Sequence, residues 1–130
     1  MGNRLNNGGD DLFNSDWLSV NLGKQKEICV IYDSIWQPVH GKLNVGVSTD
    51  LSSIPLNGLR HPAEVGTTGW FIWSGEFSDD KNFFKPLCVE HLLQIRPEIV
   101  IYLGLDVGFR FQINSSGYQD VWYDESLLNI

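Results

Sequence analysis

The apolar run GWFIWSGE, residues Gly69–Glu76, places two tryptophans, a phenylalanine and an isoleucine in a row. Successive side chains of a β-strand point to opposite faces, so Trp70 and Ile72 would face one way and Phe71 and Trp73 the other. Neither face is polar enough for open water. We therefore predict the central strand of a sheet that is covered on both faces, or covered on one face and used for contact on the other.

Further strands are predicted on both sides of this stretch. Apolar and polar residues alternate over 43–48 and 109–113, which is typical of half-buried strands. A short turn joins the second of these to an alternating stretch at 118–124, so we predict a hairpin. Continuous apolar runs favour buried strands at 27–32 and 98–103, and a weaker pattern indicates a first strand at 17–22.

One main helix is predicted, over residues 82–95. Its apolar residues, among them Phe84, Cys88 and Leu92, recur at spacings of three and four, which is the period of a helix. Asp79 or Asp80 is expected to cap its amide end. At the C-terminal end of the chain, Asp124 is expected to cap a last helical turn.

Two segments are predicted to lack regular structure. Residues 50–65 contain Pro55 and Pro62, which deny amides to a ladder, so we predict a long structured loop. Residues 1–16 are mostly Asn, Gly and Asp, which predicts a mobile N-terminal arm. The whole pattern predicts a single α+β domain over 17–130, with a mainly antiparallel sheet and the helix packed on it.

Composition limits the classes of function. A chain of 130 residues fits one domain, and 42% hydrophobic residues with 19% charged residues describe an ordinary globular protein. Sixteen acids against nine Lys and Arg give a net charge of −7, which repels phosphate backbones and anionic lipid. We therefore expect no nucleic-acid partner and no membrane partner. The second half of the chain carries most of the excess, so any electrostatic interface is expected there.

The two cysteines, Cys29 and Cys88, are too few for a disulfide framework and are expected to be reduced, buried thiols. No apolar run approaches the ~18 residues that span a bilayer, and no secretory signal opens the chain. These features predict a cytoplasmic protein. No Gly-rich phosphate loop is present in the sequence, and no cofactor is expected.

Catalytic chemistry finds little support in the sequence. Cys88 and His91 stand three apart on the predicted helix and could supply metal ligands or an activated thiol, but Cys88 falls on the apolar face, where a core thiol is the default. Glu76 is the most plausible lone catalytic carboxylate, although strands often end with an exposed Glu. The pair Asp79 and Asp80 has a simpler role as a helix cap. We therefore predict no catalytic residue and no metal site.

One constellation favours binding. If Val121 and Tyr123 point into the core, then Asp120, Trp122 and Asp124 stand in a row on the other face, as an aromatic anchor between two acids. Large aromatics with charges at the rim are typical of binding surfaces, and a basic partner would be favoured. The alternative is that the helix or the long loop covers Trp122.

Five strings between Leu43 and Leu128 carry a family resemblance. In order they are GLRHP, TGWFIWSGE, FF-x-PL-x-x-x-HL, YLGL-x-x-G-x-RF and DVWYD-x-x-LL. Together they resemble the immunity protein 33-like family, small bacterial proteins associated with polymorphic toxin systems. The resemblance implies a cytoplasmic protein that binds and neutralises a cognate toxin, often encoded beside it, and it implies no catalytic residues. It also implies that Trp70 and Trp73 belong to a shared scaffold core.

The sequence therefore predicts a non-catalytic toxin-binding protein with an acidic surface and a basic, nuclease-like toxin as partner. The alternative is a small-ligand or carbohydrate-binding module, suggested by five Trp and four Tyr. The candidate partner-binding residues are Glu76, Asp79, Asp80, Asp106, Asp120, Trp122, Asp124 and Glu125.

Overall fold

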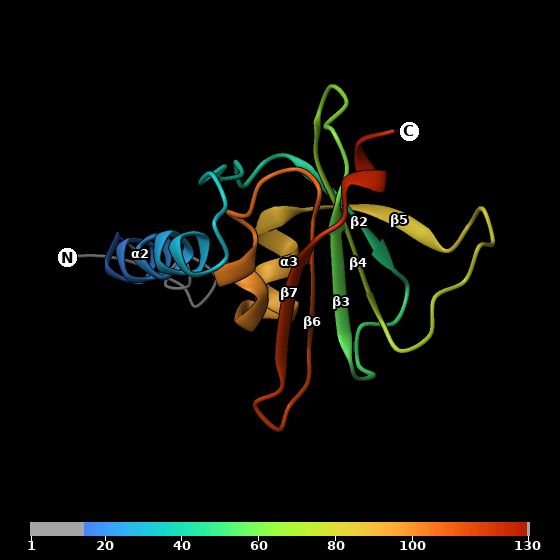
Figure 1. Ribbon diagram of the computed structural model, residues 1–130. Coiled ribbons are helices and arrows are strands. Elements are labelled where there is room, and N and C mark those ends of the chain that lie inside the picture. Colours follow the sequence, from blue (N-terminus) through green and yellow to red (C-terminus); the bar gives the residue numbers. More distant parts are fainter. Residues whose placement is uncertain (1–14, 130) are drawn as a thin grey trace.

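The GWFIWSGE stretch forms most of β4 (Thr67–Ser74), which lies inside a six-stranded sheet of order β5-β2-β4-β3-β6-β7 (Figure 1). The computed structural model describes residues 15–129. Only the β2–β4 pair is parallel, and the other four pairs are antiparallel. The predicted central strand, α+β class and mainly antiparallel sheet are confirmed. The other strands are β2 (Asn44–Ser48), β3 (Leu56–Arg60), β5 (Phe84–Cys88), β6 (Phe109–Ile113) and β7 (Gln119–Tyr123).

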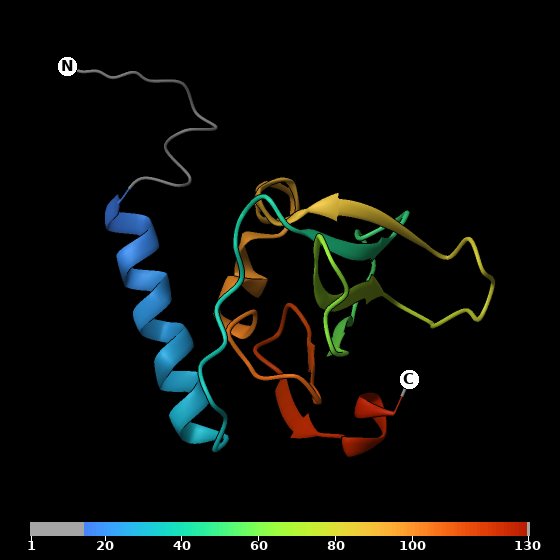
Figure 2. The same cartoon turned by 90° about the horizontal axis from the view of Figure 1, so that it is seen from above.

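The longer helices lie on one face of this sheet (Figures 1 and 2). They are α2 (Ser15–Ile31), α3 (Val89–Ile95) and the 3-10 helix η1 (Pro97–Tyr102). A second 3-10 helix, η2 (Glu125–Leu128), follows β7 at the other side of the sheet. Residues 1–14 of the predicted arm lie outside the described residues, and α2 begins at Ser15. No helix within residues 15–129 is long and apolar enough to cross a membrane.

The core fills the space between the sheet and these helices. Trp70 and Ile72 of β4 are buried there in one cluster with apolar residues that include Leu92 of α3, Leu103 just after η1 and Phe111 of β6. The Trp70 indole donates a hydrogen bond of 3.1 Å to the carbonyl of Leu103, so its one polar atom is satisfied. Trp73, on the opposite face of β4, is also buried. Trp70 therefore belongs to this core as predicted, whereas Trp73 is buried on the other face of the sheet, outside the core cluster.

Arg60 at the end of β3 ties three separate segments together from inside this core. Its guanidinium donates hydrogen bonds to the carbonyls of Thr68 at 3.0 Å, Gln37 at 2.7 Å and Leu105 at 2.6 Å. The same group lies 5.6 Å from the Trp70 ring. Burial lowers the pKa of Arg60 to about 10, so the side chain remains a cation at neutral pH.

The strands predicted at 17–22 and 27–32 are wrong, because both segments belong to α2. The side chains that this helix buries are Gln25, Ile28 and Cys29, which are spaced by three and four, whereas the neighbouring Val30 and Ile31 are exposed. Gln25 donates 2.8 Å to the Val100 carbonyl and so joins α2 to η1. The short apolar run at 27–32 favours a buried strand. The helical spacing of the buried residues becomes visible only when the polar Gln25 is counted among them.

The main helix is α2, and the prediction that the main helix spans residues 82–95 is therefore wrong. Residues Phe84–Cys88 form the edge strand β5, and only Val89–Ile95 are helical. Asp79 and Asp80 cap no helix, and Asp80 instead accepts a turn hydrogen bond of 2.8 Å from the amide of Asn82. Apolar residues at 84 and 87 fit a helical spacing, yet here they point to opposite faces of a strand.

Two further predictions are corrected. Residues 98–103 are not a strand, because most of them form η1, whose first residue Pro97 favours a helical start. The loop predicted over 50–65 contains β3, and its two prolines stand just outside that strand. The predicted strand at 43–48 and the 109–124 hairpin are confirmed. The cap at Asp124 is confirmed too, since its side chain accepts from the amide of Ser126 at 3.1 Å.

Candidate functional site

No long helix within residues 15–129 covers the sheet face opposite α2, α3 and η1, and the short η2, the β4–β5 loop and the β3–β4 turn lie on its side (Figure 2). We call it the open face. Residues paired directly across strands share a face. One row on this face therefore runs from β5 to β7 through Pro86, Gly46, Phe71, Leu59, Arg110 and Trp122. A second row runs through Trp73, Asn57, Gln112 and Asp120.

The β4–β5 loop closes one end of the open face with aromatic rings. Phe77 packs edge-to-face on Trp73 with centroids 5.5 Å apart, and Phe83 packs on Phe84 at 4.9 Å. Phe84 in turn lies 5.1 Å from Phe71. Such pairs stabilise each other beyond the burial of their area. The loop is therefore anchored on the open face, and its acids are held close to that end.

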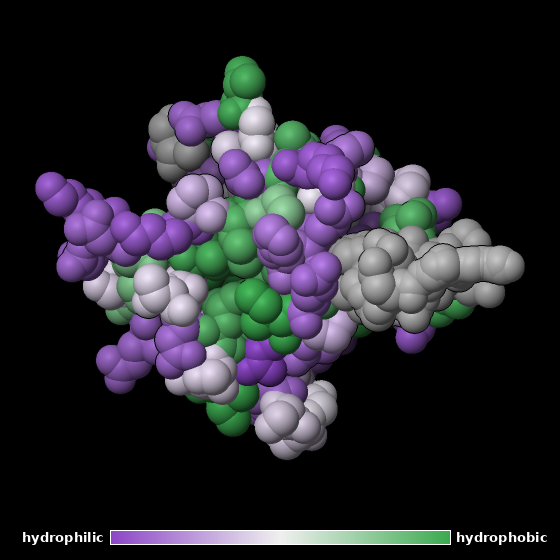
Figure 3. Space-filling view, turned by 180° about the vertical axis from the view of Figure 1, so that it is seen from behind, coloured by the Kyte–Doolittle hydropathy of each residue, from purple (hydrophilic) through white to green (hydrophobic). Residues whose placement is uncertain are grey.

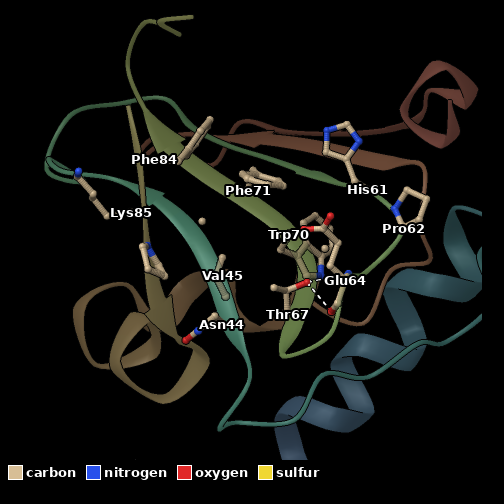
Figure 4. A pocket seen from close by; sticks show the side chains of 13 residues that line it. Asn44, Val45, His61, Pro62, Glu64, Thr67, Trp70, Phe71, Phe84 and Lys85 are labelled. Carbon is tan, nitrogen blue, oxygen red and sulfur yellow. Dashed lines mark hydrogen bonds between the residues drawn. The ribbon is translucent and has the colours of Figure 1, made fainter. Parts of the chain in front are cut away.

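A groove of about 460 Å³ lies beside this aromatic cluster, between the β3–β4 hairpin and β5 (Figure 4). Phe71, Phe84 and His61 contribute to its lining, together with the carboxylate-bearing Glu64. Gly46 keeps the groove close to the sheet, because a Cβ there would stand 2.6 Å from the Phe71 ring. His61 donates through Nδ1 to the Leu127 carbonyl at 2.9 Å, which fixes η2 against this side of the sheet.

The other end of the open face carries Trp122 on β7. Its side chain is 38% exposed, so the alternative in which the helix or the long loop covers it is wrong. The Arg110 guanidinium lies 5.5 Å from the Trp122 ring and bonds the Asp124 carboxylate at 3.1 Å. The hydroxyl of Ser126 and, secondly, Arg110 hold the pKa of Asp124 below its usual value. Arg110 therefore packs against the Trp122 ring while its charge is paired with that of Asp124.

Strand β7 orients most of its side chains as the alternation predicts. Val121 is buried in the core. Tyr123 packs on Phe109 at 5.3 Å, on the covered face, yet is 51% exposed. The reason is that β7 is the last strand of the sheet, so no further strand within residues 15–129 lies beside the outer side of the Tyr123 ring. The prediction that Tyr123 points into the core is therefore only half right.

The eight predicted contact residues fall into three groups. Asp120, Trp122, Asp124 and Glu125 lie together at the β7 end, and Glu76, Asp79 and Asp80 are exposed on the β4–β5 loop. Asp106 lies apart, in the turn before β6, where its amide bonds the Ser34 hydroxyl at 3.0 Å. Sequence reasoning missed Arg110 and Gln112. Their alternation with Phe109 and Phe111 was a usable signal for the same face.

The side of the molecule that carries α3 and β5 looks different. Apolar residues gather in its middle and hydrophilic residues surround them (Figure 3). A second groove, of about 490 Å³, separates α2 from α3 and η1 and is lined by Trp36, Val39 and Leu93 among others. It offers fewer charged groups than the open face, with Glu90 as its one carboxylate.

The candidate catalytic residues are not connected to one another. Cys88 is half-buried at the start of α3, whereas His91 and Glu76 are exposed, and no hydrogen bond or ion pair joins any two of them in the described chain. No three His, Cys, Asp or Glu side chains between residues 15 and 129 form a metal-binding group. Both cysteines are free, and burial raises the pKa of the Cys29 thiol, whereas Cys88 is less buried than predicted.

Comparison with known proteins identifies the family. No curated protein and no solved structure matches the chain. The Imm33-like domain family matches residues 24–124, which is most of the chain. The match begins inside α2, upstream of the motifs that first indicate the resemblance, so residues 24–31 of that helix lie within the matched region. The protein is therefore a member of the Imm33-like domain family.

Proposed function

We propose that this protein is a non-catalytic immunity protein that binds and neutralises a cognate toxin in the cytoplasm, through its open face. The observation that carries the proposal is Trp122, a large aromatic that stands exposed on an uncovered sheet between acidic side chains. Membership in an immunity family supports a protein partner in general. The open face supplies the surface on which such a partner would dock.

The chemistry of the open face favours a basic partner. Its aromatic anchors, Trp122 at one end and the Phe71 groove at the other, offer the apolar contacts that dominate binding energy in protein interfaces. The acids lie at its two ends, on the β4–β5 loop and around β7. Charges at a rim speed association and select the partner more than they add affinity. A basic toxin, for example a nuclease, fits this arrangement.

Co-expression with the toxin encoded beside the gene tests the proposal. We expect the wild-type protein to restore growth of cells that express the toxin, and to co-purify with it in a fixed ratio. The variant Trp122→Ala should lose protection, whereas the matched control Ile31→Ala, which removes an exposed apolar side chain from α2, should retain it. Toxicity that wild-type protein does not relieve, with no complex formed, would contradict the proposal.

A second function has one observation in its favour. The groove beside Phe71 has the volume of a small-ligand site, and its lining includes three aromatic residues and two prolines. A small-ligand or carbohydrate-binding module would use it, and Trp70 in its lining would report the ligand by a change in fluorescence. Titration with sugars that leaves the fluorescence unchanged would remove this alternative.

A further inference from the structure

The two edges of the sheet differ in what they offer another strand. At one edge, the amide of Val89 donates 3.0 Å to the Leu43 carbonyl, and this pair sets the alternation along β5. Leu87 and Lys85 therefore direct their amides towards β2, and Pro86 points its backbone outwards. Proline has no N–H to donate, and outward proline is a common device against strand pairing. The β5 edge is blocked at its centre.

The β7 edge has no such protection. The amide of Asp124 donates 2.7 Å to the Gly108 carbonyl, and that of Asn114 donates 3.2 Å to the Tyr118 carbonyl. Because antiparallel pairs alternate, the even-numbered residues of β7 bond to β6. The N–H and C=O groups of Gln119, Val121 and Tyr123 then point away from the sheet. Within residues 15–129 no strand pairs with that side.

The side chains beside this edge select the kind of strand that can be added. On the open face, Trp122 stands between Asp120 and Asp124, and Glu125 follows. The nearest cation, Arg110, is already bonded to Asp124. An added strand would place alternate side chains next to this row, since neighbouring strands lie ~4.8 Å apart. Basic side chains flanking an apolar one would match the acid–Trp–acid pattern.

A second copy of the chain is a poor occupant of the same edge. Pairing β7 with another β7 would place two rows that each contain Asp120, Asp124 and Glu125 side by side on the same face, and such clustering of like charges is destabilising. Each copy also carries a net charge of −7. A basic strand from a different protein meets neither penalty.

We propose that the toxin adds an extended, basic segment as a seventh strand along β7, bonded to the outward amides and carbonyls of Gln119, Val121 and Tyr123. This inference rests on the proposed function, because it names the part of the toxin that the immunity protein holds. Main-chain hydrogen bonds would supply affinity, and the row around Trp122 would supply selectivity. The open face then continues without a break from the protein onto its partner.

A pair of variants at one position tests the role of the backbone. Tyr123→Pro and Tyr123→Ala remove the same side chain, but only proline also removes the outward N–H and fills its space with a ring. In the complex obtained by co-expression with the neighbouring toxin, we expect Tyr123→Ala to bind within ~3-fold of wild type and Tyr123→Pro to bind at least ~10-fold more weakly. Equal affinities for the two variants, with equal thermal stability, would overturn the inference.

Amide exchange in the wild-type protein provides a test that needs no variant. In the free protein the amides of Gln119, Val121 and Tyr123 should exchange fast, and those of Asp120 and Trp122 slowly. In the toxin complex the three odd-numbered amides should become protected. A stable complex in which they still exchange fast contradicts the added strand but leaves the proposed function standing. Absence of any complex removes both, and protection that rises with protein concentration in the free protein indicates self-pairing and overturns the basic partner.

Discussion

The two faces of the sheet are built from the same strands but with different chemistry. On the covered face, Ile72 and Phe111 are closed off from water beneath α3 and η1. On the open face, the neighbouring residues Phe71, Arg110 and Trp122 remain partly accessible. Each strand thus gives alternate residues to two environments. The covered face stabilises the fold, and the open face is free to carry aromatic and charged groups that the fold does not require.

Among substitutions on the two faces, we expect the largest loss of stability at Arg60, the cation inside the covered face. Arg60→Met leaves the carbonyls of Thr68, Gln37 and Leu105 without their donor. Because each unsatisfied buried acceptor costs about 1–3 kcal/mol, we expect the free energy of unfolding to fall by more than ~3 kcal/mol in urea denaturation. Lys24→Met, at an exposed cation on α2, is the control and should change it by less than ~0.5 kcal/mol. A loss under 1 kcal/mol for Arg60→Met would show that these bonds do not hold the core.

Ile72 and Phe71 are adjacent in β4 and lie on opposite faces, so substitutions at these two residues compare how much each face stabilises the fold. Ile72 has no exposed surface, and Ile72→Ala should lower the free energy of unfolding by about 3 kcal/mol through lost burial and a cavity. Phe71 lies on the open face and is only partly buried, so Phe71→Ala should cost less than half as much despite the larger side chain. Denaturation midpoints of the two variants, measured side by side, check the order. The reverse order would mean that the open face, too, is part of the stabilising core.

Substitution of Trp122 should weaken toxin binding strongly but change the stability of the fold only slightly. We expect Trp122→Ala to weaken the toxin complex by about 2 kcal/mol, or roughly 30-fold in Kd, as is typical of a tryptophan hot spot. Its own free energy of unfolding should change by less than ~1 kcal/mol, because the side chain is 38% exposed. Isothermal titration and thermal unfolding measure the two quantities. An unchanged Kd would place the toxin elsewhere on the molecule.

The smallest expected effect on stability is that of Asp124, which pairs with Arg110 beside Trp122, and this effect depends on pH. The pKa of Asp124 is lowered in the folded state by the Ser126 hydroxyl and by Arg110. A carboxyl with a depressed pKa stabilises the fold above its unfolded pKa of about 3.9, and the contribution is lost as pH falls through the folded value. The difference in Tm between wild type and Asp124→Asn should therefore be present at neutral pH and shrink below pH 4. A difference that grows with acidification would contradict the assigned shift.

Local patterns were enough for the strands whose two faces differ. The alternation in β2, β6 and β7 and the apolar run of β4 identify these strands, and the run of β4 also indicates its central place in the sheet. Helix α2 was not predictable in the same way. Its buried side includes the polar Gln25, and its outer side carries exposed Val20 and Ile31, so the sequence lacks a helical apolar stripe. Burial of Ile28 and Cys29 holds the helix in place, and Gln25 adds hydrogen bonds that it donates to the Val100 carbonyl and accepts from the Trp36 indole.

The candidate site was predictable only where it depends on one strand. Asp120 and Trp122 follow from alternation within β7. The partnership of Arg110 with Trp122 and the groove beside Gly46 depend on which strands pair and in which register. Register between distant strands is set by the whole sheet, and the crossover order β5-β2-β4-β3 cannot be read from local periodicity.

If the open face and the β7 edge bind the toxin, a hydrogen-exchange footprint of the complex should lie on these two surfaces. Peptides from α2 to β7 would be compared between the free protein and the co-purified complex. We expect toxin binding to protect amides in the β6–β7 hairpin and in the β4–β5 loop, and to leave the exchange of α2 unchanged. Protection confined to α2 and the α2–α3 groove, with the β6–β7 hairpin unchanged, would contradict it.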